Sequence, residues 1–487
     1  MMPRRTATRP GWGAEPDVTD WVQQSYYWIS SELLTHLGFL LALVFLANLL
    51  REKRSPSSTI AWLLVILLSP YVGVPLYLIF GGRKMIPMAR RKQSVYGEPH
   101  AIGPRSSATG TERLLASYGV PPARDGNGFE LVTSGTDAYR RIMAMIDEAR
   151  STIHITTYIL GWDEGSRAII DRLIQRTREG VTVRLLIDDL GSWRLRRRNL
   201  DPLTEAGAQV AFFMPVLHVP FRGRTNLRNH RKLIVIDGRI CLTGGMNLGW
   251  PSIAPPGSRP LWRDVAAIVA GPIVADLEAL FDSDWRFATG SGPRPAPGNS
   301  VAPLAPSGEP TMAQLVASGP DVPGEPLYES LLALIFGAKT RIWIVTPYFV
   351  PDEMLARALS LAARRGVDVR LIVPARSNHP TADLARASYL RDVHNAGGKV
   401  LLYGPDMLHA KVVLFDDQVA VIGSANMDMR SLFLNYEVSL FVWTPREVER
   451  VAAWARGLMA HALRELPTPS WPRELAENVV RLLSPLL

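Results

Sequence analysis

The chain has 487 residues, 47% of them apolar and 20% charged, which excludes a disordered or collagen-like protein and favours more than one folded domain. A formal net charge of +9 suits an anionic partner, either acidic lipid or nucleic acid, without choosing between them. The single cysteine, Cys241, excludes an intramolecular disulfide and a thiolate zinc cluster, and we interpret it as a small core residue.

Two uncharged apolar stretches, residues 33–50 and 60–80, follow a polar N-terminal extension. Each is long enough to cross a hydrocarbon core of about 30 Å as a helix, which predicts a transmembrane helical hairpin over residues 31–84. A buried hairpin of a soluble domain is the alternative. A signal peptide is not favoured, because about thirty residues precede the first stretch and a second stretch follows it.

The orientation of this hairpin depends on the basic residues that flank it. Three lie in the loop between the stretches, and five follow the second stretch, namely Arg83, Lys84, Arg90, Arg91 and Lys92. The larger cluster favours a cytoplasmic location for the downstream domains. Pro70, Gly73 and Pro75 can kink the second stretch or make it re-entrant.

The rest of the chain contains an internal duplication, because three sequences recur in the same order in both halves. The matched pairs are ELVTSG (130–135) with QLVASG (314–319), ARSTIHITTYIL (149–160) with AKTRIWIVTPYF (338–349), and REGVTVRLLIDD (178–189) with RRGVDVRLIVPA (364–375). Each half alternates β-branched apolar runs with segments of helical period. This alternation predicts two duplicated α/β domains with helices packed on a buried sheet.

These patterns divide the chain into seven segments. They are an N-terminal extension (1–30), the membrane hairpin (31–84), a connector (85–128), the first α/β domain (129–289), a linker rich in Pro and Gly (290–311), the second α/β domain (312–465) and a C-terminal amphipathic helix (466–487). The last helix either packs on the second domain or touches the bilayer, and we favour packing.

A repeated stretch carries the candidate chemistry. NHRKLIVIDG (229–238) and LHAKVVLFDD (408–417) each contain His-x-Lys, four further residues and Asp. Their β-branched content predicts a strand, in which alternate side chains share a face. His230 and Lys232 therefore project together into one space.

Asp237 does not join them by this alternation. It precedes Gly238, and Asp-Gly after a strand is a hairpin-turn signal, so we expect Asp237 mainly to fix the end of the strand and its network. The second copy has the same parity at His409, Lys411 and Asp416.

Two His-Lys pairs in duplicated halves predict one cationic pocket on a pseudo-twofold axis, which suits a phosphodiester. One neutral imidazole attacks phosphorus to form a phospho-histidine, and the other, protonated, delivers a proton to the departing alkoxide. The lysines stabilise the phosphoryl oxygens, so we expect no metal and no other cofactor. The predicted catalytic set is His230, Lys232, Asp237, His409, Lys411 and Asp416.

Two further repeats supply candidates for substrate binding and orientation. GGMN (244–247) and GSAN (423–426) both start seven residues after the motif aspartate, and their small residues allow a ligand or strand to approach closely. Asp264 and Glu437 are candidates to hold an imidazole by its second nitrogen. This orienting set comprises Asn247, Asn426, Ser424, Asp264 and Glu437.

At this point the motifs resemble a known family. The doubled His-x-Lys-x4-Asp with its Gly-Gly/Ser-x-Asn is similar to the phospholipase D superfamily. PYVGVPLYLIFGGRK (70–84) and GSANMDMRSLFLNYE (423–437), together with the two motifs, look like bacterial cardiolipin synthases of that type. The resemblance covers roughly residues 30–465. One departure is ARSNHP (375–380), where this family often has Ser-Asp-His, so Asn378 stands in place of an acid.

The resemblance implies two phospholipase D-like α/β domains with one shared active site. It implies that two phosphatidylglycerol molecules give cardiolipin and glycerol, with His230 as nucleophile and His409 as acid and base. It also implies a multi-pass protein of the bacterial inner membrane, with the catalytic domains in the cytoplasm and a phospholipid membrane as partner.

Three alternatives remain open at this stage. They are a membrane-bound phospholipase D that hydrolyses lipids, a related phosphatidyltransferase using another lipid alcohol, and a non-catalytic lipid-binding scaffold. Arginines at 228 and 231 suit phosphate from either lipid or nucleic acid. The apolar stretches argue against nucleic acid, because an enzyme held at the bilayer meets a concentrated lipid substrate.

Overall fold

The computed structural model describes residues 56–80, 92, 94–99, 110–215, 227–258, 262–291 and 309–482, with single positions between 33 and 47. The N-terminal extension (1–30) and most of the linker (290–311) lie outside the described residues. The chain divides into two compact units, Met1–Gly82 and Arg83–Leu487, each of which is considered by itself.

In the first unit the second apolar stretch is not one helix. It forms α2 (Pro56–Leu68) and α3 (Pro70–Phe80), which are separated by Ser69. The rings of Trp62 and Tyr77 meet edge to face at 5.5 Å, so the two helices fold back on each other. Within the described part of the chain, every helix is too short or too polar to span a bilayer. The membrane hairpin predicted over 31–84 is therefore not confirmed, and the break at Ser69 agrees with the kink that Pro70 and Gly73 allow. Most of the first apolar stretch (33–50) lies outside the described residues.

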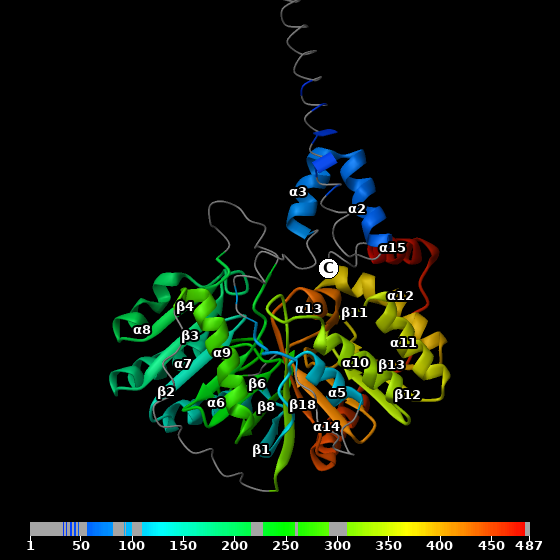
Figure 1. Cartoon of the computed structure of the whole chain (residues 1–487). Coiled ribbons are helices and arrows are strands. Elements are labelled where there is room, and N and C mark those ends of the chain that lie inside the picture. Colours follow the sequence, from blue (N-terminus) through cyan, green and yellow to red (C-terminus); the bar gives the residue numbers. More distant parts are fainter. Residues whose placement is uncertain are drawn as a thin grey trace, which may run out of the picture. The chain divides into compact units, whose positions relative to one another are not determined.

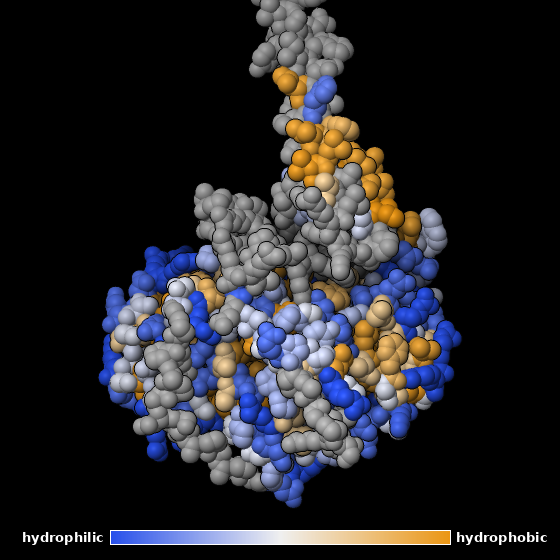
Figure 2. Space-filling view, viewed as in Figure 1, coloured by the Kyte–Doolittle hydropathy of each residue, from blue (hydrophilic) through white to orange (hydrophobic). Residues whose placement is uncertain are grey.

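Local sequence explains this break. Proline at position 70 disfavours a helical conformation at Ser69 and suits the first turn of α3. Gly73 lets the helices touch, because a Cβ there would lie 2.5 Å from the carbonyl oxygen of Val65. Apolar side chains cover the outside of both helices (Figure 2), with Leu68 81% exposed.

The second unit has two halves that lie side by side (Figure 1). They share one long sheet, and the strand order is the same in both halves. From the centre outwards, the first half runs β1-β8-β6-β5-β2-β3-β4, and the second half runs β9-β18-β16-β15-β10-β12-β13, with β19 at its edge. The halves join where β1 pairs with β9 in antiparallel fashion. The internal duplication predicted from sequence is thus a pseudo-twofold repeat of one α/β fold.

The first half contains these elements: α5 (Gly110–Ser117), β1 (Arg124–Val132), α6 (Gly135–Glu148), β2 (Thr152–Thr157), α7 (Glu164–Arg178), β3 (Thr182–Asp188), η1 (Arg197–Leu200), α8 (Asp201–Glu205), β4 (Gln209–Phe213), β5 (Leu233–Ile236), β6 (Ile240–Gly244), β7 (Trp262–Arg263), β8 (Ala266–Ala270) and α9 (Ile273–Thr289). Its first strand starts five residues before the expected boundary at 129.

The second half contains β9 (Thr311–Ser318), α10 (Pro326–Gly337), β10 (Arg341–Val345), β11 (Phe349–Val350), α11 (Glu353–Arg364), β12 (Asp368–Pro374), α12 (Pro380–Asn395), β13 (Lys399–Tyr403), β14 (Met407–Leu408), β15 (Val412–Phe415), β16 (Val419–Gly423), β17 (Met427–Asp428), α13 (Met429–Phe433), β18 (Glu437–Val442), α14 (Pro445–Met459), β19 (Ala462–Leu463) and α15 (Trp471–Leu482).

Equivalent helices in the two halves start with the same signal. Asp163 caps α7 by accepting a hydrogen bond from the backbone of Ser166, and Asp352 caps α11 by accepting one from Leu355. The strands between the helices are almost completely buried, with Ile155 and Leu371 at 0% exposure. Continuous apolar runs of this kind are expected where helices cover both faces of a sheet.

The C-terminal helix α15 packs on α12, in agreement with the preferred prediction. Glu477 of α15 is buried and its carboxylate accepts a hydrogen bond from Arg391 at 2.6 Å. The guanidinium of Arg481 lies 4.3 Å from the ring centroid of Tyr389.

Candidate active site

The segment that carries the first histidine pairs with the other half of the molecule rather than with its own sheet. Asn229 forms a parallel bridge with Tyr436, and the backbone amide of His230 donates to the carbonyl of Tyr436 at 2.9 Å. Strand β5 therefore starts only at Leu233, three residues later than a strand beginning at His230. This pairing brings Nδ1 of His230 to 2.9 Å from Oε2 of Glu437.

The second histidine has the equivalent arrangement, with the roles of the two halves exchanged. Strand β14 pairs in parallel with β7, and the backbone amide of His409 donates to the carbonyl of Arg263 at 2.8 Å. Nδ1 of His409 lies 2.7 Å from Oδ2 of Asp264. Each histidine is thus held by a carboxylate from the opposite half, so the site exists only where both halves meet.

The carboxylates fix which nitrogen of each ring carries the proton. Burial alone would raise the pKa of Glu437, but His230 and Lys232 outweigh it and lower the pKa. The pKa of Asp264 is likewise lowered, because His409 and Lys411 outweigh burial. An ionised carboxylate only accepts hydrogen bonds, so Nδ1 of each imidazole donates. This leaves Nε2 of each ring for chemistry.

The two lysines lie beside the histidines, and the charge of Lys411 affects the pKa of Lys232. Nζ of Lys232 donates to the carbonyl of His230 at 2.7 Å, and Nζ of Lys411 donates to the carbonyl of His409. Burial, together with the like charge of Lys411, lowers the pKa of Lys232 to about 7. Burial lowers the pKa of Lys411 to about 8.

The histidines respond to lysines from both halves. Burial lowers the pKa of His230, and the charges of Lys232 and Lys411 add to this effect. Burial lowers the pKa of His409 to about 3, again with contributions from both lysines. The four groups therefore share one buried electrostatic site that favours an anion.

Aromatic rings line this site, and sequence reasoning missed them. The ring of Tyr158 meets His230 edge to face at 4.8 Å, and the ring of Trp262 lies 4.3 Å from His409. Nζ of Lys232 lies 5.4 Å from the centroid of Tyr158. The repeated TTYIL and TPYFV segments contained a signal, because both halves place a tyrosine, Tyr158 or Tyr348, within three residues of the end of a core strand.

The small residues of the GGMN and GSAN repeats make room for the carboxylates. A Cβ on Gly245 would lie 2.2 Å from Oδ1 of Asp264. At the equivalent position Ser424 donates a hydrogen bond to Oε2 of Glu437. The two carboxylates are therefore not equivalent, since among the described residues a hydroxyl donates to Glu437 but none donates to Asp264.

Both motif asparagines are buried near this cluster, with Asn247 at 4% and Asn426 at 7% exposure. Nδ2 of Asn426 donates to the hydroxyl of Ser431 at 3.2 Å. Their side-chain oxygens have no hydrogen-bond partner within the described structure, which leaves an acceptor on each for a substrate hydroxyl.

The motif aspartates lie apart from this group, at the opposite end of β5 and β15. The carboxylate of Asp237 accepts hydrogen bonds from the backbone of Arg150, Ser151 and Thr152, and Asp416 does the same for residues 339–341. Both adopt left-handed backbone conformations, with φ of 54° and 50°. These contacts agree with the expectation that the aspartates mainly fix the end of the strand, and a direct part in the chemistry stays a prediction.

Other expected features also have defined places. Asn378 accepts a hydrogen bond from the hydroxyl of Tyr348 at 2.6 Å. Arg228 is 1% exposed and its Nη1 donates to the carbonyl of Met214. Among the described residues, no group of three or more His, Cys, Asp or Glu side chains is arranged to hold a metal ion.

Comparison with known proteins agrees with this geometry. The family model described as "Cardiolipin synthase, PLD-like domain" matches residues 142–285 and 331–459, and "Phospholipase D-nuclease N-terminal" matches residues 40–82. Cardiolipin synthase 1 of Bacillus cereus is 34% identical over 464 residues, which are 90% of each chain. The major cardiolipin synthase of Bacillus subtilis is 34% identical over 482 residues, covering 94% of this chain and 100% of its own.

The crystal structure of phosphatidylserine synthase from Haemophilus influenzae has the same fold, with a TM-score of 0.56 at 16% identity over 74% of this chain and 95% of that chain. The duplicated fold and the paired histidines define a phosphatidyltransferase of the phospholipase D superfamily. The chain belongs to the bacterial cardiolipin synthases of that superfamily.

Proposed function

We propose that the protein transfers a phosphatidyl group between two phosphatidylglycerol molecules, giving cardiolipin and glycerol through a phospho-histidine. The observation that carries this mechanism is the pair of histidines, each held through Nδ1 by a carboxylate of the opposite half. Two imidazoles with free Nε2 atoms in one cationic site match a reaction that needs a nucleophile and a proton donor.

In the first step, Nε2 of His230 attacks the phosphorus of the donor lipid. The P–N bond forms as the bond to the glycerol oxygen breaks, and Nε2–H of His409 gives its proton to that oxygen. This step requires His409 to be protonated. The negative charge of the bound phosphodiester favours protonation, because it raises the lowered pKa of His409. Glycerol leaves as a neutral alcohol.

In the second step, the headgroup hydroxyl of the acceptor lipid replaces the glycerol. Its proton passes to Nε2 of His409, its oxygen bonds to phosphorus, and the P–N bond to His230 breaks. The product has two phosphodiesters, and both histidines return to their initial states. One phosphodiester is exchanged for another, so no nucleotide is consumed.

The remaining groups stabilise charge. In this mechanism Lys232 and Lys411 neutralise the non-bridging oxygens, and their burial strengthens the interaction. Glu437 and Asp264 stabilise an imidazolium when one forms and keep each ring in the required tautomer. Asn247 and Asn426 offer acceptors for headgroup hydroxyls.

The same proposal places the enzyme at the inner membrane, held there by the apolar N-terminal segments with the catalytic halves in the cytoplasm. Five basic residues after the second segment, against three before it, support this orientation. Retention at the bilayer favours attack by a lipid alcohol over attack by water.

Incubation of the purified full-length enzyme with phosphatidylglycerol alone tests the proposal. The expected products are cardiolipin and glycerol in equal amounts. Phosphatidic acid as the main product would identify a hydrolase, and a product that requires phosphatidylethanolamine would identify a different acceptor. Activity retained after His230→Ala would exclude the phospho-histidine and leave a different mechanism.

A further inference from the structure

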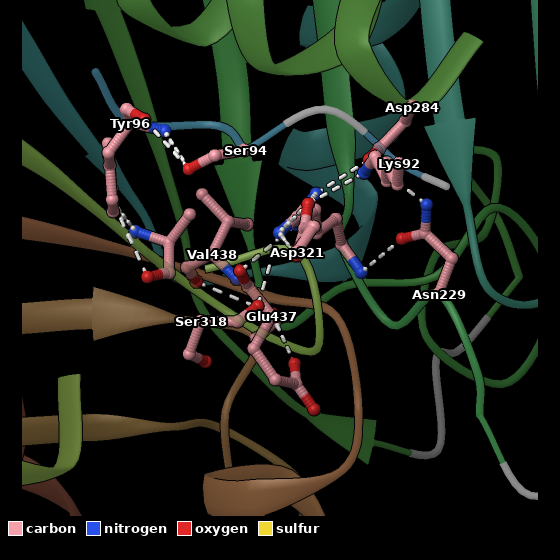
Figure 3. Close-up of polar contacts among 12 residues, drawn as sticks. Lys92, Ser94, Tyr96, Asn229, Asp284, Ser318, Asp321, Glu437 and Val438 are labelled. Carbon is pink, nitrogen blue, oxygen red and sulfur yellow. Dashed lines mark hydrogen bonds and ion pairs between the residues drawn. The ribbon is translucent and has the colours of Figure 1, made fainter. Parts of the chain in front are cut away.

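A buried cluster of four charged residues forms around Arg231, the residue after the first histidine, and Figure 3 shows three of its members, Lys92, Asp284 and Asp321. Arg231, which separates His230 from Lys232 in the chain, points away from the site and is 0% exposed. Its Nη1 lies 2.6 Å from Asp284 of α9, and its Nη2 lies 3.2 Å from Asp321, which follows β9. The two carboxylates come from opposite halves.

The second cation of this cluster comes from outside both halves. Lys92, in the connector, is 3% exposed, and its Nζ lies 2.6 Å from Asp321 and also pairs with Asp284. Two cations and two carboxylates give the cluster zero net charge. Burial alone would raise the pKa of Asp321, but Arg231 and Lys92 outweigh it and lower the pKa.

The connector is also fixed just after this contact. The backbone amide of Val95 donates to the carbonyl of Asp321 at 3.2 Å. The hydroxyl of Tyr96 accepts a hydrogen bond from the backbone amide of Ala317 at 2.5 Å. Hydrogen bonds of the residues that follow Lys92 therefore give it a defined position within the catalytic unit.

Direct hydrogen bonds lead from this cluster to the histidine. Nδ2 of Asn229 donates to Asp284 at 3.0 Å, and Oδ1 of Asn229 accepts from the backbone amide of Arg231 at 3.0 Å. Nε of Arg231 donates to the backbone carbonyl of Glu437 at 3.1 Å. Both neighbours of His230, and the residue that holds its ring, are thus tied to the cluster.

We propose that Lys92 is a positioning residue for His230, which makes the connector after the apolar N-terminal helices a working part of the active site. By balancing Asp284 and Asp321, it keeps Arg231 and Asn229 in the places that set the contact between His230 and Glu437. This inference rests on the proposed function, because it assumes that neutral His230 is the nucleophile.

The charge balance predicts that two variants shift the pH profile of kcat in opposite directions. Lys92→Met leaves one uncompensated negative charge behind His230, which favours the imidazolium, so the acidic limb of the kcat profile moves to higher pH. Asp321→Asn leaves one excess positive charge and moves that limb to lower pH. The double variant restores neutrality and returns the limb towards its original position.

The groups that face His230 from other elements stay the same in every variant. They are Glu437 of β18, Lys411 ahead of β15, Lys232 of its own segment and the ring of Tyr158 after β2. A shift of the limb therefore reports the cluster and not a change in the pocket.

The experiment measures turnover of a soluble phosphodiester, bis(4-nitrophenyl) phosphate, by the full-length enzyme in detergent. For Lys92→Met we expect kcat to fall roughly tenfold to a hundredfold with KM nearly unchanged, since misplacement by about 1 Å has effects of this size. Arg124→Met is the control, because it removes a half-exposed partner of Asp276 on the same helix α9 and should leave kcat and the limb unchanged.

The outcomes separate the inference from the proposed function. If the wild-type enzyme forms no phospho-histidine, the mechanism in the proposed function is contradicted. A wild-type enzyme that forms it, with both single variants keeping its kcat and pH limb, would overturn the role of Lys92. If Lys92→Met does not fold, Asp321→Asn alone decides, since an unmoved limb overturns the inference and a downward shift supports it.

Discussion

Nδ1 of His230 lies 2.9 Å from Oε2 of Glu437, although 207 residues separate them in the chain and they belong to different halves. His409 and Asp264 repeat this relationship in reverse at 2.7 Å. The catalytic groups therefore depend on the docking of the two halves and not on either fold alone.

Replacing the carboxylates should lower the rate without unfolding the protein. Glu437→Gln or Asp264→Asn leaves the imidazole without an anionic acceptor, which releases the tautomer and destabilises an imidazolium. We expect kcat for cardiolipin formation to fall roughly 10²- to 10⁴-fold. A kcat within threefold of wild type, measured in mixed micelles, would contradict the role of these pairs.

Variants of the two histidines should behave differently on a substrate whose leaving group needs little protonation. With phosphatidyl-4-nitrophenol, the departing phenolate needs little protonation, so His409→Ala should still form a phospho-enzyme and then stall. His230→Ala should form none. Mass spectrometry of the denatured proteins tests this, and an adduct on the His230→Ala protein would reverse the assignment.

Anion binding should be coupled to proton uptake. The pKa of Lys232 is about 7 and that of Lys411 about 8 in the empty site, so both lysines are partly neutral at pH 7.5. A bound anion raises both pKa values and those of the histidines. Calorimetric titration with tungstate in two buffers of different ionisation enthalpy should show net proton uptake, and Lys232→Met should reduce it. Net proton release would argue against this electrostatic description.

The motif aspartates should matter for stability rather than for chemistry. Asp237→Asn keeps a residue that tolerates the left-handed conformation but weakens hydrogen bonds to the turn before β2. We expect a loss of about 1–3 kcal/mol in unfolding free energy, with kcat of the folded enzyme nearly unchanged. Asp416→Asn should behave in the same way. Denaturant unfolding beside a rate assay separates the two effects, and a hundredfold loss of kcat in folded protein would support a catalytic role.

Sequence alone predicted the duplication, because matched runs recur in the same order in both halves, and it proposed the catalytic side chains from their repeated spacing. Alternation along a strand was enough to place His230 with Lys232 and to separate Asp237 from them. It could not assign Glu437 to His230, since that contact is set by a parallel bridge between Asn229 and Tyr436. Pairing across a domain interface leaves no periodic pattern in either segment.

Two features could not be decided from the sequence, for the same physical reason. Arg231 was considered with the arginines that suit phosphate, yet its side chain is buried against two distant carboxylates. For residues 60–80 the hydropathy pattern predicted a spanning segment, and it left open whether Pro70 and Gly73 break the helix. The close approach of Gly73 to Val65 is a tertiary contact, which a hydropathy pattern does not contain.

The exchange of carboxylates between halves also bears on how such an enzyme is made in a cell. During synthesis the first half emerges with His230 but without Glu437, and it holds Asp264 for a histidine that has not yet been translated. We therefore expect a nascent chain that ends before residue 437 to lack the hydrogen bond that orients His230, and the proposed chemistry to begin only after the second half has folded against the first.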